Sequence, residues 1–154
     1  MAMHTWFECK IRYEKTMENG MNKKVTEPYL VDALSFTEAE ARIIEEITPF
    51  ISGEFTVADI KRANYSELFP CDEEAADRWF KCKLIFITLD EKSGAEKKTS
   101  TQVLVQATDL RDAVKKLDEG MKGTMADYQI ASVAETPLMD VYPYSAEPDD
   151  KPEV

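Results

Sequence analysis

Hydrophobic and polar residues alternate along two stretches of the chain, at residues 6–15 and 79–89. In the first stretch every second residue from Phe7 to Tyr13 is apolar, and polar residues lie between them. A period of two is typical of a β-strand with one buried face. Both stretches are therefore predicted to be strands of a sheet that covers a core.

A turn sequence and a second strand-like segment follow each of these stretches. The turns contain Gly20 and Gly94, which can supply the positive φ that tight hairpins need. The segments after them, at 24–33 and 98–107, are rich in Val, Leu and Thr. Two antiparallel hairpins are predicted.

Helical spacing of apolar residues follows each hairpin, at about 36–49 and 110–122. The apolar positions are Phe36, Ala39, Ile43 and Ile47 in the first segment and Leu110, Ala113, Leu117 and Met121 in the second. Ser35 and Asp109 precede the two segments, and each has an acidic residue three positions later, as in a capping box. Two capped helices are predicted.

The chain also repeats itself, which is the strongest signal in the sequence. Residues 6–13 align with residues 79–86, and four of the eight positions are identical. Further matches pair Lys23, Lys24, Leu30, Val31, Ala33 and Ala39 with Lys97, Lys98, Leu104, Val105, Ala107 and Ala113, and Phe69-Pro70 with Tyr142-Pro143. Third strands predicted at 53–62 and 127–135 complete a ββαβ order in each half. We therefore predict an internal duplication.

The predicted fold class is α+β, with duplicated ββαβ units that form one mostly antiparallel sheet and two helices packed on one face. Residues 1–144 are expected to form a single pseudo-symmetric domain, followed by a disordered acidic tail at 145–154. Within the domain, repeat one spans 6–70, a linker spans 71–78 and repeat two spans 79–143. The residues expected to face the helices are Phe7, Cys9, Ile11, Phe80, Cys82 and Leu84, against Ile43, Ile47, Leu117 and Met121.

The formal net charge of −11 is unevenly distributed along the chain. Repeat one holds eight basic and twelve acidic residues, repeat two holds nine and ten, and the linker and tail carry the remainder. This balance disfavours nucleic acid as a partner. No apolar run is long enough for a bilayer and no signal peptide is recognisable, so a cytoplasmic protein without a membrane partner is expected.

The sheet face opposite the helices carries the candidate binding residues. Both repeats place a tryptophan four residues before a lysine on this face, at Trp6 and Lys10 and at Trp79 and Lys83. Exposed aromatic rings stack on bases or anchor protein interfaces, and lysines neutralise phosphates or acidic partners. The alternative is that the tryptophans pack at the ends of their strands and the lysines are simply solvated.

The lysine pairs Lys23-Lys24 and Lys97-Lys98 are a second duplicated feature, next to the hairpin turns. They could contact phosphates. Lysine pairs are also common on soluble surfaces, and acidic residues lie near both pairs in sequence. Solvated lysines are therefore the alternative interpretation here too.

The sequence contains no catalytic or metal-binding pattern with diagnostic spacing. His4 is the one histidine and has no second ligand at metal-binding spacing, while Cys9 and Cys82 fall on the predicted core face. Cys71 is the third cysteine, and no CxxC pair is present. The glycines form no nucleotide-binding loop. We therefore expect no enzyme, no cofactor and no metal.

Three segments of the chain resemble a family of small uncharacterised proteins from Bacteroidetes and their phages or mobile elements. They are WFECKIRY, VTEPYLVDALSFTEAEARI and VAETPLMDVYPY. The resemblance covers nearly the whole of the two repeats. It implies a bacterial, cytoplasmic, phage-linked setting and transfers no catalytic residue.

Two hypotheses for the function follow. The first and favoured one is a non-enzymatic protein-interaction module whose sheet docks an unknown protein partner in a phage or mobile-element pathway. The second is a single-stranded nucleic-acid-binding protein that stacks bases on its tryptophans and contacts phosphates with its lysines. The sequence does not define the oligomeric state.

Overall fold

The computed structural model describes residues 5–124 and 127–143. The chain divides into two compact units. The first unit contains the chain as far as Ala63 together with the segment from Leu138 onward, and the second contains Asn64–Pro137. His4 and the predicted acidic tail at 145–154 lie outside the described residues.

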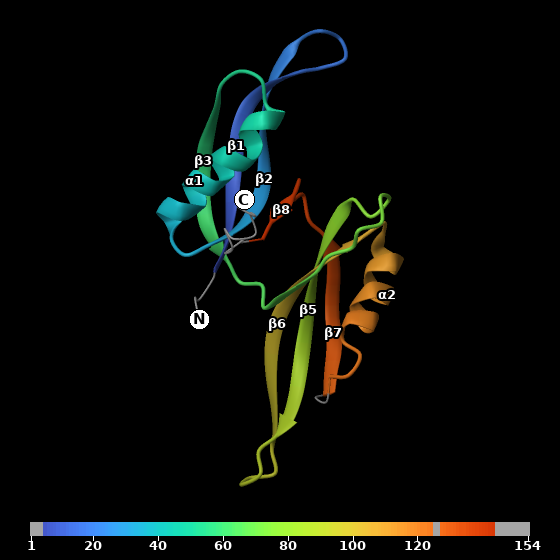
Figure 1. The fold of residues 1–154 in the computed structure, drawn as a ribbon. Coiled ribbons are helices and arrows are strands. Elements are labelled where there is room, and N and C mark those ends of the chain that lie inside the picture. Colours follow the sequence, from blue (N-terminus) through green and yellow to red (C-terminus); the bar gives the residue numbers. More distant parts are fainter. Residues whose placement is uncertain (1–4, 125–126, 144–154) are drawn as a thin grey trace, which may run out of the picture. The chain divides into compact units, whose positions relative to one another are not determined.

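The first unit is a four-stranded sheet with one helix across one face (Figure 1). Its elements are β1 (Thr5–Thr16), β2 (Asn22–Ala33), α1 (Phe36–Ile47), a 3-10 turn (Thr48–Phe50), β3 (Phe55–Ala63) and β8 (Val141–Tyr142). The strand order is β3-β1-β2-β8, in which only the β2–β8 pair is parallel.

The second unit has the same arrangement. Its elements are β4 (Glu67–Phe69), β5 (Arg78–Leu89), β6 (Glu96–Ala107), α2 (Leu110–Gly120) and β7 (Asp127–Glu135). The strand order is β4-β6-β5-β7, in which only the β4–β6 pair is parallel. The predicted α+β class, with mostly antiparallel strands, is confirmed.

Strand register also corresponds between the units. Phe7 pairs with Val31 in the first hairpin, and Phe80 pairs with Val105 in the second. The edge strands β3 and β7 have a bulge at the matching place, at Ala58 opposite Lys10 and Ile11 of β1 and at Ala131 opposite Lys83 and Leu84 of β5. A bulge adds one residue to one strand and bends it. Equivalent positions of the two repeats therefore occupy equivalent places in their sheets.

The last strand of each repeat joins the sheet of the other unit. β4 ends repeat one, yet it pairs with β6 in the second unit, where Leu68 lies opposite Leu104. β8 ends repeat two, yet it pairs with β2 in the first unit, where Val141 lies opposite Leu30. The segment before β8 is anchored as well, because the Met139 N–H donates to the Pro28 oxygen at 2.9 Å. The two repeats thus exchange their final strands.

Both helices begin at the predicted caps. The Ser35 hydroxyl accepts the Glu38 N–H at 3.1 Å, and the Asp109 carboxylate accepts the Asp112 N–H at 2.9 Å. The acidic side chain three residues after each cap reaches back to the backbone, since Asp112 accepts the Thr108 N–H at 3.0 Å. This reciprocal bonding satisfies backbone donors that a helix start would leave free.

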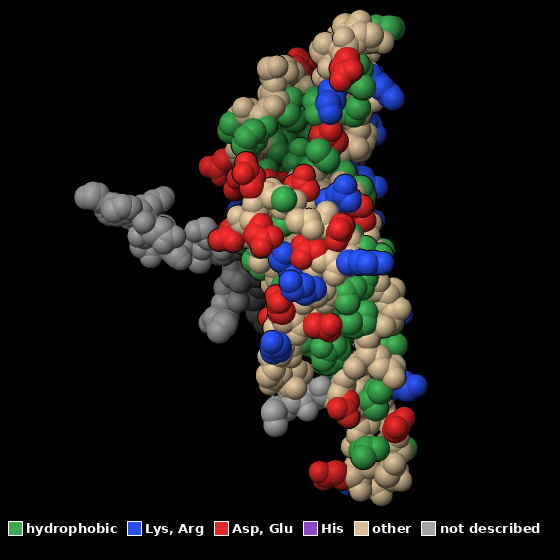
Figure 2. Space-filling model, turned by 90° about the vertical axis from the view of Figure 1, so that its right-hand side faces the viewer, with side chains coloured by type: hydrophobic (Ala, Val, Ile, Leu, Met, Phe, Trp, Pro, Cys, Tyr) green, Lys and Arg blue, Asp and Glu red, His purple; other side chains and the backbone are tan. Residues whose placement is uncertain are grey.

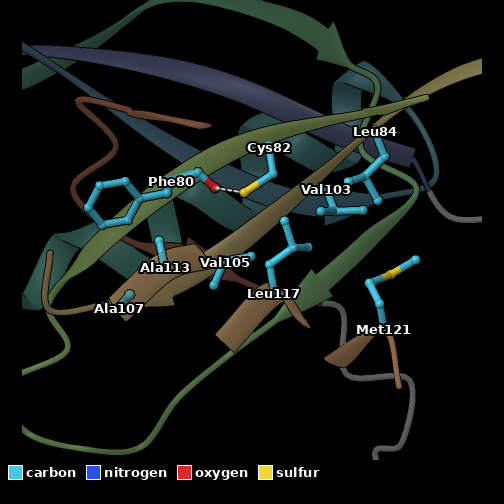
Figure 3. Close-up of a cluster of buried hydrophobic side chains, with 9 residues drawn as sticks. All are labelled: Phe80, Cys82, Leu84, Val103, Val105, Ala107, Ala113, Leu117 and Met121. Atoms are coloured by element: carbon cyan, nitrogen blue, oxygen red, sulfur yellow. Dashed lines mark hydrogen bonds between the residues drawn. The ribbon is translucent and has the colours of Figure 1, made fainter. Parts of the chain in front are cut away.

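Each unit has its own hydrophobic core between its sheet and its helix. In the second unit the side chains of β5 and β6 face α2, and the Cys82 thiol points toward the Phe80 carbonyl at 3.9 Å (Figure 3). The predicted core residues are all buried, in two clusters. The expected single sheet is corrected to two four-stranded sheets, because a strand from the other repeat extends each three-stranded sheet on its open side.

Candidate functional site

The outer face of the first unit is the side of its sheet opposite α1, and it carries Trp6 and Lys10 as predicted. Trp6 is partly exposed and lies between Asp32 and Ala63 of the neighbouring strands. Lys10 is partly exposed and lies between Pro28 and Asp59. This face is therefore accessible, but its lysine has a carboxylate across the strand.

Charges of opposite sign alternate across the first unit's outer face. Glu8 of β1 lies opposite Lys61 of β3, and Lys10 of β1 lies opposite Asp59 of β3. Opposite charges on directly paired strand positions attract each other. Lys10 and Lys61 therefore each have a carboxylate at the directly paired position, whereas Arg12 on the same face lies between Thr26 and Thr56.

Trp79 does not have the exposure expected of a stacking residue. It is 5% exposed, and its backbone oxygen accepts both the N–H and the hydroxyl of Thr136, at 2.9 and 3.0 Å. The chain that leaves β7 is thus bonded across the start of β5, so this strand end is not free. Of the two interpretations that the sequence left open, packing at the end of the strand therefore applies to Trp79.

The outer face of the second unit is the side of its sheet opposite α2, and it carries uncompensated lysines. Lys83 is exposed and lies between Gln102 and Ser132, as predicted for a candidate binding residue. Lys81 is also exposed and lies between Leu104 and Ala134. Neither lysine forms an ion pair with another residue that the structure describes.

Other residues of the same face extend this surface. Lys98 of β6 is exposed and lies opposite Ile87 of β5, which is partly exposed, and Ile85 of β5 is partly exposed opposite Ser100. The register thus places Lys98 on the same face as Lys83. This surface is a candidate binding site and is called the binding face below; it consists of Lys81, Lys83, Ile85, Ile87 and Lys98.

The alignment of the two repeats does not identify Lys81 as a candidate residue. Its equivalent in repeat one is Glu8, of opposite charge, so a search for features kept by both repeats discards it. The alternation along β5 could have found it, because positions 81, 83, 85 and 87 share one side of the strand. Differences between the repeats carry as much functional information as their similarities.

The remaining predicted lysines are exposed and lie in different surroundings. Lys23 is opposite Lys15, Lys24 is opposite Glu14, and Lys97 is opposite Thr88. Lys24 also borders an open depression of about 630 Å³ that Arg12, Glu14 and Glu54 line as well. The two hairpin pairs therefore do not have matching environments, although their sequences match.

A tyrosine cluster in the first unit was not predicted. The Tyr13 and Tyr29 hydroxyls both donate to the same oxygen of Glu27, at 3.0 and 3.4 Å. Burial, followed by the neighbouring Glu27 carboxylate, raises the pKa of both tyrosines. The phenols therefore stay protonated donors at neutral pH and satisfy a partly buried carboxylate, which is a structural role.

A depression of about 690 Å³ in the second unit contains the third cysteine. Cys71 is partly exposed there beside Lys116, whose ammonium contacts Asp112 at 2.8 Å and Glu73 at 3.3 Å. Hydrogen bonding to Lys116 and to the Thr108 backbone lowers the pKa of Asp112 to about 2, and hydrogen bonding to Asp112 raises that of Lys116. Both groups are held in their charged forms, so neither serves as a proton-transfer group near pH 7.

The other two cysteines are buried in the two cores. Burial raises the pKa of the Cys9 thiol to about 12 and that of Cys82 to about 11. A thiol, unlike a thiolate, is a poor nucleophile and metal ligand. Both residues therefore act as small hydrophobic side chains, as their place in the sequence pattern indicates.

The described part of the chain has a surface of mixed charge on the face drawn in Figure 2 and no group of side chains suited to a metal ion. On the face drawn in Figure 2, basic and acidic side chains are interspersed. Among the described residues, no group of three or more His, Cys, Asp or Glu side chains could hold a metal ion. Within the same residues, no helix has the length and apolar character needed to cross a membrane.

Fold and surface together define a class of protein: an α+β chain with two ββαβ units, each with one helix-covered face and one outer face. The particular family follows from a comparison with protein-family models. The chain belongs to the family described as Domain of unknown function (DUF4494), whose model matches residues 5–144. No curated protein matches the chain.

Proposed function

We propose that this chain is a non-enzymatic binding module and that the binding face of the second unit docks an acidic protein. The observation that carries the proposal is the pair Lys81 and Lys83, exposed side by side on β5 with only uncharged residues opposite them. Unpaired cations on a sheet attract carboxylates, because no intramolecular partner competes for them.

The apolar residues of the binding face favour a protein over a phosphate backbone as the partner. Ile85 and Ile87 continue the row of Lys81 and Lys83 along β5, and both are partly exposed. Protein interfaces combine an apolar centre with a polar rim. A partner with aliphatic residues next to carboxylates complements this face.

A binding role also agrees with the chemistry of the titratable groups. Lys116 and Asp112 neutralise each other, and the tyrosines near Glu27 remain protonated. None of these groups is poised to exchange a proton near neutral pH. The proposal therefore assigns recognition rather than catalysis to the chain.

Binding of single-stranded nucleic acid is the second candidate, and one observation favours it. Lys81, Lys83 and Lys98 share a face and could follow a phosphate backbone. Base stacking is less well supported, because Trp79 is 5% exposed and Trp6 lies opposite the acidic Asp32. We therefore rank this function below protein binding.

The proposal also includes the organism and the pathway in which the protein acts. The resemblance of the sequence to proteins of Bacteroidetes and their phages suggests a bacterial cytoplasmic protein in a phage or mobile-element pathway. The neighbouring genes of family members test this directly. Phage or mobile-element genes beside most of them would support it, and their absence would remove this part of the proposal.

The direct test compares two polyanions, poly-L-glutamate and an unstructured oligonucleotide, by titration at low salt. We expect poly-L-glutamate to bind and the Lys81→Glu/Lys83→Glu variant to weaken it by about tenfold or more, since two attractive pairs become repulsive. The control is Lys23→Glu/Lys24→Glu, which changes the net charge by the same amount in the first hairpin.

Three outcomes decide between the candidates. Loss of binding in the Lys81/Lys83 variant but not in the control supports the binding face. Equal loss in both variants indicates a response to net charge alone and contradicts the proposal. Quenching of Trp6 fluorescence by the oligonucleotide, reversed by salt, supports nucleic-acid binding instead.

A further inference from the structure

β3 is an edge strand with one free side. β3 lies at one edge of the sheet, whose strand order is β3-β1-β2-β8. Among the strands that the structure describes, β1 is its only partner. An edge strand presents a row of unpaired N–H and C=O groups that can pair with another chain. β3 is nine residues long, so its edge is long enough to template another strand.

The sequence of β3 is complementary to itself when it is reversed. Ile60, the sixth of its nine residues, has Asp59 before it and Lys61 after it, and both charged residues are exposed. If two copies of β3 pair antiparallel about Ile60, Asp59 of each copy lies opposite Lys61 of the other. Each of these pairs joins opposite charges at directly facing strand positions, where they attract most strongly.

The neighbouring strand extends this complementarity. Within one copy, Glu8 of β1 lies opposite Lys61, and Lys10 of β1 lies opposite Asp59. Across the paired edges a row would therefore run Glu8, Lys61, then Asp59 and Lys10 of the second copy. Four successive strands carry alternating charges, and the twofold axis generates a second identical row.

The equivalent edge of the second unit lacks this pattern. Ser132 and Ala134 of β7 occupy the positions that Asp59 and Lys61 occupy in β3. Pairing of β7 with itself about Val133, the equivalent of Ile60, would place Ser132 opposite Ala134, so no opposite charges would face each other. The charges of β3 are thus not required by a fold that both units share.

The geometry points to a homodimer in which β3 pairs antiparallel with β3 of a second copy, centred on Ile60, so that the two first units share one continuous sheet. The partner is a second copy of this chain, because pairing of β3 with itself in this register places Asp59 opposite Lys61 twice. Ile60 is partly buried within one copy and would contact its own equivalent at the axis.

The bulge in β3 limits the contact. The register shift beside Lys10 leaves Ala58 without a partner on β1, so regular pairing is confined to the residues around Ile60. A short interface with a charged row associates weakly and responds strongly to salt. We therefore expect a reversible dimer that forms at low salt and dissociates at high salt.

Sedimentation velocity of the full chain tests the dimer at concentrations of about 10 µM to about 1 mM, the range in which small interfaces associate. The variants are Asp59→Lys and Lys61→Asp, each of which places like charges opposite each other across the axis. Each variant alone should be monomeric. An equimolar mixture should regain the dimer, because lysine at 59 then faces aspartate at 61.

Matched controls make the result specific to β3. Ser132→Lys and Ala134→Asp introduce the same residue types at the equivalent positions of β7 and should leave the dimer intact. Circular dichroism and melting temperature confirm that each variant is folded, and recovery in the mixture proves it independently.

Three results would contradict the proposed homodimer. A wild-type chain that stays monomeric over the whole range overturns the homodimer and leaves the β3 edge without this partner. A dimer that survives both single variants places the contact elsewhere. A mixture that stays monomeric while both variants are folded contradicts the proposed register.

Discussion

At the scale of single residues, side chains that the repeats do not share account for most of the specific chemistry. Phe69 of β4 packs over the end of α2, where a Cβ on Gly120 would lie 2.9 Å from the ring. Lys81 replaces a glutamate of repeat one on the binding face. The contact of Phe69 with α2 joins distant parts of the sequence, so alternation and helical spacing could not predict it, whereas the alternation along β5 does place Lys81 on the outer face.

The contact between Gly120 and Phe69 yields a mutational prediction. Glycine to alanine within a helix usually stabilises by up to about 1 kcal/mol, but Gly120→Ala should destabilise by about 1–3 kcal/mol because the methyl group overpacks against the ring. In a Phe69→Ala background the same substitution should become neutral or stabilising. Urea unfolding of the four proteins measures this, and an additive cycle would rule out the contact.

Asp112 yields a prediction about pH. Its pKa falls from 3.8 to about 2 in the folded chain, so ionised Asp112 favours folding, fully above pH 4 and less as the pH approaches 2. Asp112→Asn should therefore lower the melting temperature at pH 7, and its difference from wild type should shrink between pH 4 and pH 2. Asp109→Asn is the control, since asparagine keeps the cap acceptor. A difference independent of pH would contradict the cause assigned here.

At the scale of elements, the sequence predicts nearly all of the local structure. The helices expected at 36–49 and 110–122 end two residues earlier, and the long strands differ from prediction by no more than two residues. Periodicity, capping residues and turn glycines act within one element, which is why they can be recognised locally. The duplication of the sequence stays a prediction, although the two units match in register and bulges.

The sequence does not predict which sheet each of the short strands β4 and β8 joins. Each has only two or three residues, and nothing in such a segment specifies which sheet it joins. Their sheet is chosen by tertiary contacts, such as the stacking of Tyr142 on Tyr29 at 6.2 Å. The sequence matches Phe69-Pro70 with Tyr142-Pro143, but it could not indicate which unit each of these segments joins.

At the scale of the whole molecule, the exchange of final strands couples the stability of each unit to the far end of the other repeat. Val141 is 7% exposed in the first unit and belongs to β8, whereas Leu68 of β4 is partly buried in the second unit. Damage near the C-terminus should therefore weaken the N-terminal unit. This relation distinguishes exchanged strands from two repeats folded independently.

Reciprocal substitutions test the exchange. Val141→Asp should destabilise the first unit by about 2 kcal/mol or more, because it buries a carboxylate in an apolar site, and Leu68→Asp should act on the second unit. Hydrogen exchange followed by mass spectrometry locates each effect. Faster exchange in β1 and β2 is expected for Val141→Asp, and in β5 and β6 for Leu68→Asp. The reverse assignment would contradict the strand order.

We propose that the partner of the whole molecule is an acidic protein that binds the face built from β5 and β6 of the second unit. Capture from a lysate of the native host tests it most directly, with wild type, Lys81→Glu/Lys83→Glu and Lys23→Glu/Lys24→Glu compared quantitatively after nuclease treatment. We predict an acidic protein retained by wild type and by the hairpin variant and lost from the Lys81/Lys83 variant. Equal retention by all three proteins, or release of the captured material by nuclease, would contradict the claim.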